Sequence, residues 1–314
     1  MKKPLLSDCL ITYNHANYIE QAIEGVLMQS VNFPWELIIA DDFSTDGTRE
    51  ILLKYKEKYP NFIKLILQEK NVGPGKNFSD LLNEPQSKYI AYFEGDDYWI
   101  DPLKLQKQVD FIESHPDYVL IHSDVFIKNS DGEYIKSLRI IFSKIISRYN
   151  STNVVKQLIK GNYIMSVTVL MAKSALSDAL NEITENDNQI ATIDYTLFLE
   201  LSKLGKIHYQ QEKTAVYRIL NNSESNNINI DARLNFIETT INISRFYNQK
   251  FLVGINNLYF DRVLLSAQLF EFAKRGLVSK FISAFYKGIK SDKLNILKLK
   301  NYYYFIVLIV SKIK

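Results

Sequence analysis

The stretch YIAYFEGDDYW, residues 89–99, joins a short hydrophobic run to three closely spaced carboxylates. Five apolar residues, typical of a buried strand, lead directly into Glu94, Asp96 and Asp97. Adjacent buried carboxylates without partners are costly, because each charge loses its hydration and repels its neighbour. EGDDYW contains no basic residue to pair with them. A divalent cation, Mg2+ or Mn2+, would offset these charges and could also hold a phosphate, because both ions favour oxygen ligands.

The residues that precede this stretch alternate strand and helix patterns. Short apolar runs predict strands at 10–14, 35–42, 62–68 and 89–94. Amphipathic spacing predicts helices over 17–29, after the turn at 44–48, and near 77–83. This βαβαβαβ order predicts an α/β fold with a mostly parallel sheet and helices on both faces.

Polar residues follow three of the predicted strands at the point where each strand ends. The first strand ends in Thr12-Tyr13-Asn14, the second in Asp41-Asp42, and the fourth in Glu94-Gly95-Asp96-Asp97. In open parallel sheets, ligands bind at the carboxyl ends of the strands. The fold should therefore bring these three segments to one crevice.

The rest of the chain contains further strands and then mostly helices. Beyond residue 100 the patterns predict a helix from Pro102, two strands over 118–135, a strand leading into a helix at 163–176, a helix ended by Gly205, and a pair of short strands over 206–219. NNSESNNIN, residues 221–229, is polar and reads as a linker, with helical patterns from about 231. We therefore expect one domain over 1–220 and a mainly helical region over 221–314.

Composition narrows the class of protein. The chain of 314 residues is 46% hydrophobic and 23% charged, the balance of a folded protein. Its net charge is +3 with the basic residues spread out, which argues against a nucleic-acid partner. A single cysteine, Cys9, excludes an intrachain disulfide and a cysteine-based zinc cluster.

Neither end of the chain is expected to cross a membrane. The N-terminal segment reads as a strand and not as a signal peptide, and no run reaches the roughly eighteen apolar residues of a spanning helix. Near the C-terminus, Tyr302 to Val310 form an apolar run that is followed by Lys312 and Lys314. Two interpretations remain open: peripheral contact with a membrane surface, or packing on the body of the protein.

Three segments together resemble the family 2 glycosyltransferases of the GT-A fold, of the bacterial surface-glycan type. They are ITYNHANYIEQAIEGVLMQ (11–29), ELIIADDFSTDGTREIL (36–52) and KYIAYFEGDDYWIDPLKLQKQVDFI (88–112). The resemblance covers about residues 5–220. It implies a GT-A-type, Rossmann-like sheet with a nucleotide-sugar half (1–100), an acceptor half (101–220) and a C-terminal helical extension.

The resemblance also implies a donor site. Thr12, Tyr13 and Asn14 would contact the nucleotide sugar, with Tyr13 stacking on the base. Asp42 would form a hydrogen bond with uracil. Phe43 replaces the family's glycine in DDFSTD, which predicts a turn geometry that L-residues tolerate.

Catalytic roles are implied in the same way. Asp96 would lie near the ribose and the metal, and Asp97 would coordinate the Mn2+ or Mg2+ bound to the diphosphate. Arg218 would contact the diphosphate. Asp194 matches the base that takes the proton from the acceptor hydroxyl, and Glu200 is the rival candidate. The absence of a QxxRW signature indicates a single transfer per binding event.

The leading hypothesis is an inverting, metal-dependent hexosyltransferase that uses a nucleotide sugar, with a UDP-sugar as the expected donor. Its acceptor would be a glycan or a lipid-linked intermediate of capsule, lipopolysaccharide or other surface polysaccharide. It would act in the cytoplasm or on the inner face of the cytoplasmic membrane. The alternative is a catalytically silent, nucleotide-binding scaffold of a glycan-assembly complex. A nucleotidyltransferase is disfavoured, because TYNHANY lacks a glycine-rich phosphate loop.

Overall fold

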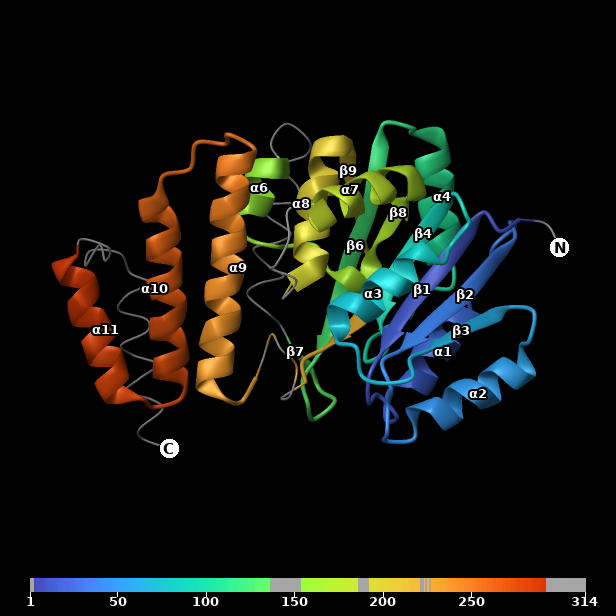
Figure 1. Ribbon diagram of the computed structural model, residues 1–314, viewed down its shortest axis with the longest axis horizontal. Helices are drawn as coiled ribbons and strands as arrows, with labels where there is room; N and C mark the ends of the chain where they lie inside the picture. The colour runs from blue at the N-terminus through green and yellow to red at the C-terminus, as the bar shows by residue number, and fades with distance from the viewer. Residues whose placement is uncertain are drawn as a thin grey trace. The chain divides into compact units, whose positions relative to one another are not determined.

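The computed structural model describes residues 3–135, 154–185, 192–220, 223, 225 and 227–291 (Figure 1). The chain divides into two compact units, Met1–Leu220 and Asn221–Lys314. Within the described residues, the first unit contains the β-sheet and its flanking helices, and the second contains helices alone.

A mixed β-sheet forms the centre of the first unit, with the strand order β3-β2-β1-β4-β8-β6-β9-β5 and with β7 beside β6. Its strands are β1 (Leu6–Thr12), β2 (Trp35–Asp41), β3 (Ile63–Leu67), β4 (Tyr89–Glu94), β5 (Tyr98–Trp99), β6 (Tyr118–Lys128), β7 (Tyr134–Ile135), β8 (Leu170–Ala172) and β9 (Lys206–Arg218). The first four strands pair in parallel, whereas β8 runs antiparallel to β4 and β6. The prediction of an α/β fold with a mostly parallel sheet is confirmed.

Helices cover both faces of this sheet (Figure 1). The described helices of the first unit are α1 (Ile19–Leu27), α2 (Thr48–Lys58), α3 (Pro74–Asn83), α4 (Lys104–Ser114), α6 (Val154–Lys160), the 3-10 turn η1 (Ser166–Thr168), α7 (Lys173–Glu185) and α8 (Ile193–Leu204). Ala91 and Phe93 of β4 share one buried cluster with side chains of α1, α2 and α4. Tyr92 faces the other way, because side chains alternate along a strand, and its ring meets Phe78 of α3 edge to face at 4.9 Å.

The last strand of the sheet differs from its prediction. Residues 206–218 form one continuous strand and not a pair of short strands. Between the pairs Ser123–Gln210 and Val125–Ala215, β9 advances five residues while β6 advances two. The polar segment that suggested a turn is therefore a β-bulge, which absorbs three extra residues without ending the strand.

Two further predictions were incomplete. Helix α3 begins at Pro74, three residues before the predicted start, because proline suits the first turn of a helix. The prediction also missed β5 and α6, which are only two and seven residues long.

The second unit contains α9 (Ile230–Lys250), α10 (Asn257–Lys274) and α11 (Val278–Lys290). Asn229 caps α9 by accepting hydrogen bonds from two backbone amides, and Asn256 caps α10 in the same way with one. A small core of Leu269, Phe272, Ala273 and Phe281 joins α10 to α11. The predicted C-terminal helices are thus present among the described residues, the last of them ending at Lys290.

The apolar run from Tyr302 to Val310 lies outside the described residues. Within the residues that are described, no helix has both the length and the apolar character needed to cross a membrane.

Gly205 ends α8 as predicted, but its role is to leave space. Its φ of −175° is extended backbone that any residue adopts. A Cβ at this position would lie 2.4 Å from Cγ1 of Val119 and 3.1 Å from the carbonyl oxygen of Asp117. The helix end and the start of β6 can therefore approach this closely only without a side chain at residue 205.

We expect Gly205→Ala to lower the free energy of unfolding by about 1–3 kcal/mol, the usual cost of overpacking. Urea unfolding followed by circular dichroism would measure it. In a Val119→Ala background the same substitution should cost less, because part of the clash is removed. An equal cost in both backgrounds would contradict the steric explanation.

Candidate active site

The carboxyl ends of β1, β2 and β4 meet at one edge of the sheet. Thr12 pairs with Asp41 across one side of β1, and Ile11 pairs with Glu94 across the other. Gly95 follows β4 at a point of very close approach, where a Cβ would lie 3.0 Å from Oγ1 of Thr12. The three polar segments therefore lie side by side, as their positions after the strands predicted.

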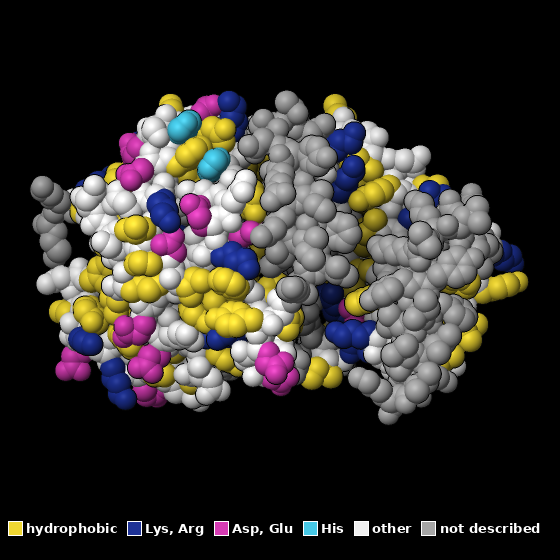
Figure 2. All heavy atoms as spheres, turned by 180° about the vertical axis from the view of Figure 1, so that it is seen from behind, with side chains coloured by type: hydrophobic (Ala, Val, Ile, Leu, Met, Phe, Trp, Pro, Cys, Tyr) yellow, Lys and Arg dark blue, Asp and Glu magenta, His cyan; other side chains and the backbone are white. Residues whose placement is uncertain are grey.

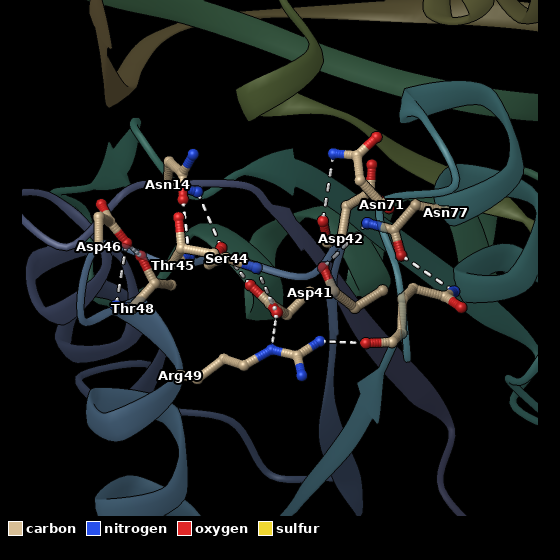
Figure 3. A network of polar contacts seen from close by, with 12 residues as sticks. Asn14, Asp41, Asp42, Ser44, Thr45, Asp46, Thr48, Arg49, Asn71 and Asn77 are labelled. Atoms are coloured by element: carbon tan, nitrogen blue, oxygen red, sulfur yellow. Dashed lines mark hydrogen bonds and ion pairs between the residues drawn. The ribbon is translucent and has the colours of Figure 1, made fainter.

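The loops after β1 and β2 are joined by a network of hydrogen bonds (Figure 3). The Asn14 amide donates to Oγ of Ser44 at 2.8 Å, and Oδ1 of Asn14 accepts from the Thr45 amide at 2.9 Å. Below them, Asp41 accepts from Nε of Arg49 at 2.5 Å. The side chain of Asn14, predicted to contact the donor, is therefore engaged in holding the two loops together.

Asp42 is almost fully buried, and its carboxylate is fixed by a third loop. Oδ1 accepts from the Val72 amide at 2.7 Å, and Oδ2 accepts from the Gly73 amide at 3.0 Å. Figure 3 shows Asn71 beside it, and the Asn71 side chain donates to the Asp42 carbonyl at 3.3 Å. Each carboxylate oxygen can accept a second hydrogen bond, so the group can still face a ligand.

Tyr13 follows β1 directly, and its side chain is exposed to solvent. It is 46% exposed, although the carbonyl of the preceding Thr12 accepts from the Asp42 amide at 3.1 Å. The exposed ring offers a flat surface on which a base can stack.

Phe43 adopts a backbone conformation that corrects the expectation for the DDFSTD turn. Its φ is +64°, in the left-handed region that L-residues rarely adopt, so the turn keeps the geometry that suits the family's glycine. The ring is 40% exposed, and the Arg49 guanidinium lies 5.0 Å from its centre. This cation–π contact offsets part of the free-energy cost of the left-handed backbone conformation.

Asp97 is the most buried acid of EGDDYW, with an exposure of 1%. Its Oδ1 accepts from the backbone amide of Arg218 at 2.7 Å. Its Oδ2 and the Oδ1 of Asp96 are buried and have no hydrogen-bond donor in the part of the chain that the structure describes. Burial, and then the charge of Asp96, raise the pKa of Asp97 well above its ordinary value of 3.8.

These two oxygens fit a divalent cation. They are hard, anionic ligands on adjacent residues, and they lack the donors that buried carboxylates normally find. Among the described residues, no group of three or more histidine, cysteine or acidic side chains is placed to hold a metal. The protein would thus supply few ligands, which suits a Mg2+ or Mn2+ ion that completes its shell with phosphate oxygens and water.

Arg218 supplies the positive charge that is missing from EGDDYW. Pairing of β5 with β9 brings it to the acids across more than a hundred residues. Its guanidinium donates to the Asp96 carbonyl and to the Gln21 side chain, and it lies 4.4 Å from the Tyr98 ring and 5.1 Å from the Tyr18 ring. The residues that hold Arg218 were not identified from the sequence. Their only sequence signal is the proximity of Tyr98 to the acids.

Asp194 lies in the first turn of α8 and is half-buried. Burial raises the pKa of the Tyr92 hydroxyl, and the charges of Glu94, Asp194 and Asp96 raise it further. Asp194 therefore belongs to the same electrostatic neighbourhood as the end of β4. Glu200, the rival base, is only 4% exposed and lies in the middle of the helix, where an acceptor cannot easily reach it.

Comparison with known proteins identifies the class. The family model described as glycosyl transferase family 2 matches residues 7–193, and the chain belongs to this family. TuaG of Bacillus subtilis, named as a teichuronic acid biosynthesis glycosyltransferase, is 31% identical over 226 residues, which are 72% of this chain and 83% of TuaG. An uncharacterized protein of Mycobacterium tuberculosis is 35% identical over 208 residues, 66% of this chain, and the match spans only 57% of that relative.

Solved structures share the fold. Staphylococcus aureus TarS (residues 1–349, in complex with UDP) matches with a TM-score of 0.53 and 18% identity, covering 85% of this chain and 71% of TarS. The Pyrobaculum calidifontis mannosyltransferase PcManGT, in complex with GDP-Man and Mn2+, matches with a TM-score of 0.55 and 13% identity, covering 100% of this chain and 88% of PcManGT. The GT-A-type fold with its C-terminal helices is confirmed.

The left-handed turn at Phe43 leads to a test of stability. Phe43→Gly should be more stable than Phe43→Ala by about 0.5–1 kcal/mol in urea unfolding, because alanine keeps the left-handed penalty and glycine loses only chain entropy. Thr45 is the control, because its φ is not positive and alanine should there be the more stable residue. The opposite order at residue 43 would rule out a strained turn.

The buried acid pair leads to a test of metal and pH. Asp97→Asn keeps an oxygen for the Arg218 amide and removes a buried negative charge. Without metal at pH 7, its melting temperature should equal or exceed that of the wild type. Because the folded pKa of Asp97 is raised, its contribution to stability is present below pH 3.8 and lost as pH rises through the folded pKa. The advantage of the variant should therefore grow from pH 4 to pH 7.

Mn2+ with UDP should raise the melting temperature of the wild type and have little effect on Asp97→Asn. The exposed acid Asp131, changed to Asn, should behave as the wild type in every condition. If Asp97→Asn melted at a lower temperature than the wild type without metal, the negative charge of Asp97 would be stabilised by the protein itself, and the prediction would be wrong.

Proposed function

We propose that this protein is an inverting, metal-dependent hexosyltransferase that moves a sugar from a nucleotide sugar to a hydroxyl of an acceptor. The expected donor is a UDP-sugar. The observation that carries the proposal is the pair of buried carboxylate oxygens on Asp96 and Asp97 that lack donors at the carboxyl edge of the sheet. A structural ion-pair network would have satisfied them. The family of the chain adds independent support.

The donor would lie across the ends of β1 and β2. Tyr13 would stack on the base, and Asp42 would accept a hydrogen bond from it, held in place by the loop at Val72 and Gly73. Thr12 and Asn14 would shape this site chiefly through the loops that they hold. The TarS structures with UDP and UDP-GlcNAc, and PcManGT with GDP-Man, support a nucleotide-sugar donor at this fold.

Asp96 and Asp97 would hold a Mn2+ or Mg2+ ion that neutralises the diphosphate as it departs. Because one oxygen of Asp97 already accepts from the Arg218 amide, Asp96, the more accessible of the two, would face the ligand more fully. Arg218 would add positive charge beside the diphosphate, fixed by its two aromatic neighbours.

Asp194 would act as the general base. The acceptor oxygen attacks the anomeric carbon on the face opposite the diphosphate, and its proton passes to the Asp194 carboxylate. The bond between the anomeric carbon and the diphosphate oxygen breaks, and its electron pair leaves with the nucleoside diphosphate. The configuration at the anomeric carbon is therefore inverted.

The acceptor would be a glycan or a lipid-linked intermediate of a surface polysaccharide, bound by the acceptor half over 101–220. The name of TuaG, which refers to teichuronic acid biosynthesis, supports this class of product. We place the enzyme in the cytoplasm, in peripheral contact with the inner face of the membrane through its C-terminal region.

A silent nucleotide-binding scaffold remains the second candidate, and Asp194 distinguishes the two. Asp194→Asn should lower the rate of sugar transfer by about 10²–10⁴-fold, the usual share of a general base, and leave UDP affinity unchanged. Asp178→Asn, a change of an exposed acid on α7, is the matched control and should leave both quantities unchanged.

Calorimetric titration of UDP, with and without Mn2+, would supply the affinities, and a screen of nucleotide sugars with release of UDP would supply the rates. UDP binding without turnover of any nucleotide sugar would favour the scaffold. Binding that depends neither on Mn2+ nor on Asp97 would end the proposal of a metal-dependent enzyme.

A further inference from the structure

Helix α11 has two apolar sides. Its inner side carries Phe281, which is fully buried, and Phe285, and these residues pack against α10. A different side exposes Ile282 and Tyr286, which lie one helical turn apart and are 56% and 67% exposed. The inner side therefore contributes to the core of the unit, whereas the outer pair lies outside that core among the described residues.

Lys290 follows Tyr286 by one helical turn, whereas Lys280 and Lys287 line the groove between α10 and α11. Lys280, Lys287 and Lys290 are all solvent-exposed on the same helix, and α11 has no acidic residue. Lys280 is 3.9 Å from the carboxylate of Asp231, which is too long for a strong ion pair. Long lysine side chains of this kind can reach outward while their stems lie beside apolar groups.

The net charge of the chain changes sign at the start of α11. Residues 278–314 contain eight lysines and one acid, a net charge of +7, whereas the whole chain has a net charge of +3. Residues 1–277 therefore have a net charge of −4. In Figure 2, acidic and basic side chains are interspersed over the first unit.

We propose that the outer side of α11, defined by Ile282, Tyr286 and Lys290, is a docking surface for a membrane rich in anionic lipid. Exposed apolar side chains flanked by lysines are the pattern of helices that lie in the headgroup region. The charge favours this occupant, because an anionic surface attracts the basic segment and repels the acidic remainder of the chain.

The docking surface explains how a catalytic unit without a spanning helix among its described residues would reach a lipid-linked acceptor. In that respect it rests on the proposed function, of which it specifies the membrane contact. The lipid interaction itself needs neither donor nor metal, so the two proposals can fail separately.

Co-sedimentation of the full chain with vesicles tests the docking surface. The wild type should bind vesicles of phosphatidylcholine mixed with phosphatidylglycerol, bind phosphatidylcholine alone much more weakly, and lose binding in high salt. The double variant Ile282→Ser/Tyr286→Ser should bind the anionic vesicles about tenfold more weakly or worse, because two half-exposed apolar side chains no longer enter the membrane. Lys287→Gln/Lys290→Gln should weaken binding as well.

Two controls match these changes. Leu252→Ser alters a more exposed apolar residue in the turn between α9 and α10, and Lys58→Gln alters a surface lysine of α2. Both should bind vesicles as the wild type does. Circular dichroism and UDP titration of every variant would show that the fold and the donor site are intact.

Several results would overturn the proposal. Equal binding of the wild type and the α11 double variant would show that another segment, such as the apolar run at 302–310, makes the contact. Equal binding to neutral and anionic vesicles would show that the lysines do not contribute to membrane binding, and the proposed preference for anionic lipid would be wrong. A dimer that the double variant dissociates, with vesicle binding unchanged, would assign the surface to a second copy of the chain. Failure of UDP to bind would affect the proposed function alone.

Discussion

The hydrogen bond from the Arg218 amide to the Asp97 carboxylate connects the two ends of the catalytic unit. It joins the loop after β4 to the last residue of β9, so the acids adopt their positions only when the last strand is in place. Without that amide, the Asp97 carboxyl group would be buried with no hydrogen-bond donor among the described residues. The site is therefore a property of the completed sheet and not of the EGDDYW segment alone.

The segment behind the acids is held as firmly as the acids themselves. The indole nitrogen of Trp99 donates to the Val167 carbonyl at 2.8 Å, and the Lys104 ammonium lies 4.1 Å from the Trp99 ring. Helix α1 packs directly on this segment, because a Cβ at Gly25 would lie 3.0 Å from the Trp99 amide. Rigid neighbours of this kind keep carboxylates close together that would otherwise move apart.

The sequence predicted what depends on local pattern and missed what depends on distant pairing. Apolar runs predicted the central strands, and their polar ends predicted the edge at which Thr12, Asp42 and Asp97 gather. It did not predict that backbone amides some thirty residues away would hold the Asp42 carboxylate, because backbone donors have no sequence signal. The β-bulge in β9 was mistaken for a turn, since both are rich in polar residues. The turn geometry at Phe43 was predicted wrongly, because a phenylalanine seldom adopts a left-handed backbone conformation.

The buried carboxylates also connect folding to metabolism. Their mutual repulsion makes the empty protein less stable than its fold would allow, and any ligand that neutralises them returns that free energy on binding. Under the proposed function, the ligand is the donor with its metal. The fraction of unfolded chain open to proteolysis would then fall as the cell's supply of activated sugar rises, so the lifetime of the enzyme would follow the availability of its own substrate.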